Sequence, residues 1–92
     1  MNNYESVIII NPSVDEQGMK ALIAKFSDLI NANGKLETVE ELGKKKLAYE
    51  IKKNSEGIYV VLTFEAKPEF IVVLERVFSI TDELIKFIVV RS

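Results

Sequence analysis

The side chains of this sequence that could do chemistry are carboxylates, because the chain has no histidine and no cysteine. The candidates among the fourteen acidic residues are two adjacent pairs, Glu40-Glu41 and Asp82-Glu83. Neighbours in a strand point to opposite faces, so Glu40 and Glu41 cannot act together on one substrate. No activated nucleophile, zinc-ligand set or phosphate-binding glycine loop can be assembled from the remaining residues. We therefore predict that the chain is not an enzyme, and we expect no metal and no cofactor.

Positive charge is the second candidate for chemistry. Twelve lysines and arginines stand against fourteen acidic residues, a formal net charge of -2, which argues against binding nucleic acid by bulk electrostatics alone. Half of the twelve lie between residues 35 and 53: Lys35, Lys44, Lys45, Lys46, Lys52 and Lys53. The run from Lys44 to Lys46 could bind phosphates, or it could discourage pairing at an exposed strand edge. The sequence leaves these two interpretations open.

The elements that must position these residues follow from the spacing of the apolar side chains. Four stretches rich in β-branched or alternating apolar residues predict strands at 4–10, 35–51, 58–64 and 85–91. Apolar residues recur at helical spacing from Met19 to Ile30 and from Ile71 to Phe78. These assignments give the order β-α-β-β-α-β.

Local signals mark where several of these elements begin and end. Ser13 or Asp15 can cap the first helix, and Pro68 suits the first position of the second. Gly34 is expected as a left-handed cap after the first helix, and a bulge or bend is expected around Gly43, where the apolar spacing changes parity. A turn is expected at residues 54–57, Asn-Ser-Glu-Gly.

This order predicts the α+β class and a single ferredoxin-like domain over residues 1–92. Right-handed crossovers give a four-stranded antiparallel sheet in the order 4-1-3-2, with both helices on one face. The side chains expected to face the helices are Ile8, Ile10, Val60, Leu62, Phe64, Phe87 and Val89. The opposite, open face would carry Val7, Ile9, Tyr59, Val61, Ile88 and Val90. We interpret this apolar set as a protein-partner face, the alternative being ordinary scattered surface residues.

Two further patterns bear on function. An RNA-recognition motif would need a cation and alternating aromatic residues where this chain has Glu56, Ile58 and Val60, so base stacking on the central sheet is disfavoured. No apolar run approaches the ~20 residues that a membrane span needs, and the N-terminal residues lack the basic start of a signal peptide. We expect a cytoplasmic protein with no membrane association.

An ordered set of short motifs resembles one family along nearly the whole chain. The set is Tyr4-Glu5, Asn11-Pro12, Glu41-Leu42-Gly43 followed by lysines, Leu47-Ala48-Tyr49, Gly57-Ile58-Tyr59 and Val89-Val90-Arg91. It resembles bacterial small-subunit ribosomal protein S-six. The resemblance implies a ferredoxin-like, non-enzymatic protein of the small ribosomal subunit. It also implies pairing with ribosomal protein S-eighteen and binding to the central domain of small-subunit ribosomal RNA with that partner.

Under this resemblance, we expect the isolated chain to be monomeric and a few of its residues to contact ribosomal RNA: Tyr4, Lys44, Lys45, Lys46, Lys86 and Arg91. Two departures affect individual contacts. Asn2 and Asn3 stand where the family often has arginine, and Glu50 follows Ala48-Tyr49 where the family usually has proline. The competing hypothesis is a homodimeric ferredoxin-like module that binds a small regulatory molecule in a concave site. No small-molecule substrate is expected under the leading hypothesis.

Overall fold

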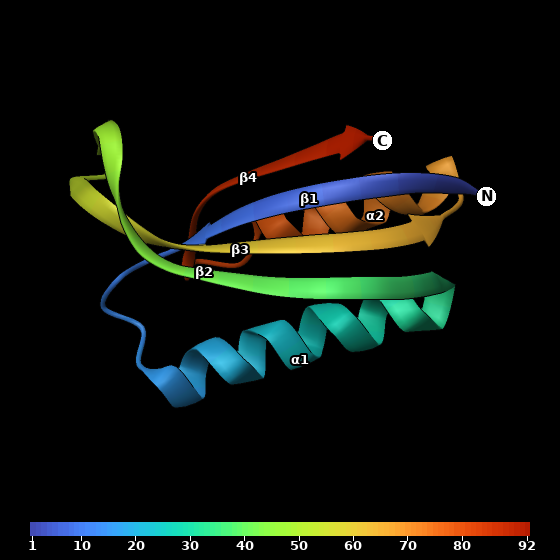
Figure 1. Cartoon of the computed structure of the whole chain (residues 1–92), viewed down its shortest axis with the longest axis horizontal. Helices are drawn as coiled ribbons and strands as arrows, with labels where there is room; N and C mark the ends of the chain where they lie inside the picture. Colours follow the sequence, from blue (N-terminus) through green and yellow to red (C-terminus); the bar gives the residue numbers. More distant parts are fainter.

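The computed structural model describes all 92 residues and contains the predicted elements in the predicted order. They are β1 (Asn2–Ile10), α1 (Glu16–Asn33), β2 (Gly34–Ile51), β3 (Asn54–Ala66), α2 (Pro68–Ser79) and β4 (Leu84–Arg91). The four strands form one antiparallel sheet in the order β2-β3-β1-β4, which confirms the predicted 4-1-3-2 order and the ferredoxin-like class. Figure 1 shows the helices packed beside the long strands, with the N- and C-termini toward the same end of the sheet. Neither helix is long and apolar enough to cross a membrane.

The two helices begin at the predicted residues. The Asp15 carboxylate accepts a hydrogen bond of 2.7 Å from the backbone N–H of Gly18, which satisfies one of the free donors of the first turn of α1. Pro68 occupies the first turn of α2, where its missing N–H has no intrahelical partner to lose. At the other end of α2, the Thr81 hydroxyl donates to the carbonyl of Val77 at 2.6 Å.

One face of the sheet packs against both helices and forms the main core. Fourteen buried residues make up this core, among them Leu22, Phe26 and Ile30 of α1 and Phe70, Leu74 and Phe78 of α2. Phe26 and Phe78 join the two helices edge to face, with ring centroids 4.9 Å apart. The strands contribute the residues predicted for this face: Ile8, Ile10, Val60, Leu62 and Phe64 are buried, and Phe87 and Val89 pack against them. The predicted face assignment is confirmed on the helix side.

The turn between β2 and β3 lies earlier than expected, so the prediction of a turn at residues 54–57 is wrong. Ile51 pairs with Asn54, which leaves Lys52 and Lys53 as a two-residue loop. Both lysines have positive φ, 50° and 65°, as a two-residue loop requires when its twist matches that of the strands. The Asn54 side-chain amide donates to the Lys52 carbonyl at 3.2 Å and supports the loop. The sequence hid this turn because lysine is an unusual residue for a left-handed position.

The two glycines that flank the first half of β2 have different roles. Gly34 has φ -176°, so the expected left-handed cap is wrong, and the residue instead begins β2 in an extended conformation. A Cβ at this position would collide with the backbone carbonyl of Glu65, so glycine is needed for the close approach of β2 to β3. Gly43 has φ 84° and lies at a register shift between Glu41 and Gly43, which confirms the predicted bulge.

Candidate nucleic-acid and protein interface

The sheet face away from the helices carries an uncovered apolar strip. Val7 lies opposite Val61 on β3 and Ile88 on β4, so these three side chains form a row across the three strands. Val90 extends the row along β4. Ile88 and Val90 are 46% and 47% exposed, while Val7 and Val61 are half-buried by their neighbours. We call these four residues the apolar strip.

The rest of the predicted partner face is covered by the chain itself. Beyond Gly43 the β2–β3 hairpin bends away from the plane of the sheet, as Figure 1 shows at the far end of β2. The side chain of Leu47, in this hairpin, packs with Ile9 and Ile85 in a second, smaller core. Ile51 and Tyr59 pack against this core. Ile9 is only 6% exposed, so the prediction that it contacts a partner is wrong. Tyr59 is half-buried at the same place.

Acidic side chains surround the apolar strip. Glu40 pairs with Val61 on the same face, Glu5 pairs with Val90, and Glu65 lies farther along β3 in the same alternation. None of them forms an ion pair within the chain, since the single salt bridge joins Lys20 and Glu16 on α1 at 3.3 Å. Lys35 of β2 lies opposite Glu65, so Glu5 and Glu40 are the carboxylates of this face with apolar residues opposite them. An apolar strip with such carboxylates beside it suits a partner surface that is apolar and basic.

The lysine run of β2 is divided between the two faces of the strand. Lys44 lies opposite Ile58, on the face that carries the main core, and Lys45 lies opposite Gly57 on the open face. Lys46 lies opposite Glu56, and all three lysines are exposed. Because successive residues of a strand point to opposite sides, the three lysines cannot clamp one phosphate together.

The remaining predicted RNA-contact residues lie on the neighbouring strands β1 and β4. Lys86 pairs with Ile9 on the open face, whereas Arg91 pairs with Tyr4 near the end of the strand. With a rise of about 3.4 Å per residue, the two basic residues are about 17 Å apart along β4. The Arg91 guanidinium donates to the Asn2 side-chain oxygen at 3.0 Å. The structure thus places two separate basic positions on this strand.

Tyr4 is part of the main core. Its ring stacks on Phe64 with centroids 5.8 Å apart, and the residue is 7% exposed. Its hydroxyl accepts a hydrogen bond of 3.4 Å from the Asn2 amide. The ring is therefore occupied in packing, and only the hydroxyl end belongs to the edge where Asn2 and Arg91 meet.

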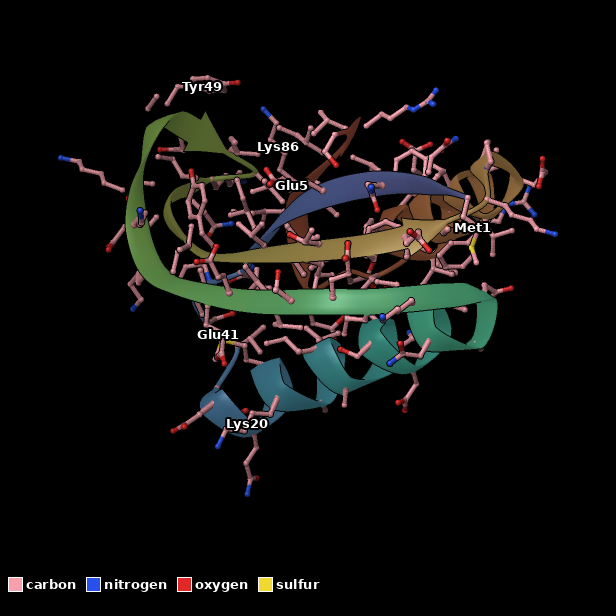
Figure 2. All side chains as sticks on the ribbon, turned by 45° about the vertical axis from the view of Figure 1, so that its right-hand side comes forward. Met1, Glu5, Lys20, Glu41, Tyr49 and Lys86 are labelled. Atoms are coloured by element: carbon pink, nitrogen blue, oxygen red, sulfur yellow. The ribbon has the colours of Figure 1, made fainter.

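Tyr49 is a candidate that the sequence analysis missed, because it contributed there only to the Leu47-Ala48-Tyr49 motif and to the predicted strand. It is 66% exposed near the end of the hairpin, and the Lys86 ammonium lies 5.9 Å from the centroid of its ring. Figure 2 shows both labelled residues on the side of the molecule away from α1. An aromatic residue within a lysine-rich hairpin was the available signal, but the sequence did not show that the hairpin bends toward β4.

The one hollow of the surface lies in the helix layer. It has a volume of about 410 Å³ and is lined by Gly18, Ala21, Leu22, Lys25, Ile80, Thr81, Asp82 and Glu83. It therefore lies between the start of α1 and the segment that follows α2, away from the open face of the sheet.

Comparisons with known proteins agree along the whole chain. The family model described as ribosomal protein S6 matches residues 3–91. The small ribosomal subunit protein bS6 of Clostridium kluyveri is 48% identical over 93 residues, covering 100% of this chain and 98% of the relative. That of Clostridium beijerinckii is 50% identical with the same coverage. The crystal structure of 30S ribosomal protein S6 from Thermotoga maritima superposes with a TM-score of 0.94 at 35% identity, covering 99% of this chain and 87% of that one.

Proposed function

Because the chain belongs to the ribosomal protein S6 family, a non-enzymatic structural component of the small subunit of the cytoplasmic ribosome, we propose that it binds ribosomal RNA as a heterodimer. The partner that we propose is ribosomal protein S-eighteen, and the RNA is the central domain of small-subunit ribosomal RNA. Family membership also favours this role over the alternative of a small-molecule regulatory module.

The observation that carries the proposal is the apolar strip with its acidic surroundings. The apolar strip, Val7, Val61, Ile88 and Val90, lies on the sheet face that no helix covers, so a partner could pack against it. Carboxylates that lack ion pairs within the chain stand beside it and would attract a basic protein. A basic partner on this face would also supply the positive charge for RNA binding that a chain of net charge -2 lacks.

Local phosphate contacts complete the proposed complex. Lys86 and Arg91 lie about 17 Å apart on β4, so they would meet different phosphates. The lysines from Lys44 to Lys46 are a second set of candidate phosphate contacts, on β2. Lys45 lies on one face of this strand and Lys44 and Lys46 lie on the other, so a single RNA phosphate would meet either Lys45 or the other two. The Tyr4 hydroxyl, beside Asn2, is the one group of that residue placed for such a contact.

The test is RNA binding by the heterodimer, measured as fluorescence anisotropy of a labelled central-domain fragment over a range of salt concentrations. Lys86→Ala and Arg91→Ala should each weaken binding, and each should reduce the slope of log affinity against log salt by about one. Lys20→Ala is the matched control, since Lys20 is also an exposed lysine but lies on α1 in the helix layer (Figure 2).

Two results would contradict the proposal in different ways. If the isolated chain and S-eighteen do not associate in sedimentation equilibrium, the heterodimer is refuted. The heterodimer could instead form while Lys86→Ala and Arg91→Ala, like the control Lys20→Ala, leave the RNA affinity and the salt slope at their wild-type values. In that case, β4 does not contact RNA phosphates.

A further inference from the structure

The proposed function leaves the exposed ring of Tyr49 unused. This residue lies near the end of the β2–β3 hairpin, and 66% of it is exposed. The ammonium of Lys86, from the start of β4, lies 5.9 Å from the ring centroid. The bend at Gly43 thus brings together an aromatic ring and a cation from strands that are not neighbours in the sheet.

The segment of β2 that carries the ring packs against the sheet on both sides of Tyr49. Tyr49 lies between Leu47 and Ile51, in a part of β2 where the pairing register with β3 shifts between Lys46 and Ile51. Leu47 packs with Ile9 and Ile85 of the sheet, and Ile51 lies against the same cluster. The backbone on both sides of Tyr49 is therefore anchored to the sheet, while the ring itself stays exposed to a ligand.

The charge around the ring is positive. Lys86 lies over the ring, and Lys52 and Lys53 form the turn a few residues farther along the chain. Glu50 is the only acidic residue from Lys44 to Lys53. An aromatic face beside cations is the arrangement that proteins use to bind unpaired nucleotides, with the base on the ring and the phosphate on the cation.

We propose that Tyr49 and Lys86 bind one unpaired nucleotide of RNA, whose base stacks on the Tyr49 ring and whose phosphate contacts the Lys86 ammonium. This inference rests on the proposed function, because it adds a base contact to an RNA site that so far contains only phosphate contacts. The stacking takes place on the bent hairpin and not on the central strands, whose sequence disfavours it.

The test compares two substitutions in the complete heterodimer. Tyr49→Leu removes the ring and keeps an apolar side chain, and should weaken binding of the central-domain RNA fragment by about 5- to 150-fold. The salt slope should stay at the wild-type value, because no charge is lost. Tyr49→Phe keeps the ring and should bind within about twofold of wild type. RNA that carries 5-iodouridine should cross-link to Tyr49 under ultraviolet light, as located by peptide mass spectrometry.

The outcomes separate this inference from the proposed function. If the wild-type heterodimer does not bind the RNA, both fail together. If it binds and Tyr49→Leu retains wild-type affinity, only the stacking inference is overturned. If Tyr49→Leu weakens association with S-eighteen while the fully formed heterodimer binds RNA as before, Tyr49 contacts the protein partner and the inference is again overturned. Circular dichroism and urea unfolding of both variants verify that the hairpin cluster keeps its stability.

Discussion

Val60 and Val61 are neighbours on β3, and glutamate substitutions at the two sites should have opposite consequences. Val60 is fully buried in the main core, whereas Val61 is half-buried in the apolar strip. We expect Val60→Glu to unfold the isolated domain. We expect Val61→Glu to leave it folded but to weaken binding of the proposed basic partner, because the new carboxylate would lie unpaired in an apolar contact.

The size of the difference follows from the burial of each residue. Val60→Glu loses about 1.5 to 3 kcal/mol of apolar burial and adds a carboxylate whose removal from water costs several kcal/mol more. This sum approaches the total stability of about 5 to 15 kcal/mol for a domain of this kind. Val61→Glu keeps its charge near water, and the like charge of Glu40 directly opposite adds only about 0.2 to 1 kcal/mol. A loss of about 1 to 2 kcal/mol is expected at position 61.

The assay is urea unfolding followed by circular dichroism, with partner affinity measured separately on the folded variant. A matched change, Val61→Thr, nearly keeps the shape and adds no charge, so it should preserve pairing far better than Val61→Glu. Equal destabilisation by the two glutamates would show that Val61 is a core residue. A folded Val61→Glu variant with wild-type affinity for S-eighteen would show that the apolar strip is not the partner surface.

Four further variants test the packing of the domain in the same unfolding assay. Leu74→Ala should destabilise the domain by about 2 to 5 kcal/mol because Leu74 is fully buried. Ile23→Ala should cost less because Ile23 is only partly buried, and equal losses would contradict the assignment of which helix side chains face the core. Ser6→Ala should stabilise by about 1 kcal/mol, since the Ser6 hydroxyl is buried without a hydrogen-bond partner, and a destabilised variant would point to a partner for it. Replacing Lys52-Lys53 by Asn-Gly should stabilise by about 1 kcal/mol by relieving two left-handed lysines, with no gain if that turn is misplaced.

The sequence by itself determined the elements, their order and the helix-facing side of the sheet. Period-two and helical patterns repeat over enough residues that Ile8, Val60 and Leu62 could be assigned to the core before any contact was known. Asp15 and Pro68 act through the backbone of their own helices, so their effects are local and readable. The change of parity near Gly43 likewise revealed a bulge in its own strand.

Tertiary structure alone decided how much of the open face remains open. The direction in which a hairpin bends after a bulge depends on distant packing partners, here Ile9 and Ile85 beneath Leu47, and no local pattern encodes that contact. The same bend covers Ile9, leaves the apolar strip exposed and brings Lys86 to Tyr49. Gly34 is similar, because its requirement for glycine arises from the backbone of Glu65 on β3 and not from its own φ angle. The candidate RNA and protein surfaces therefore depend on contacts between residues far apart in the chain, which a period in the sequence cannot show.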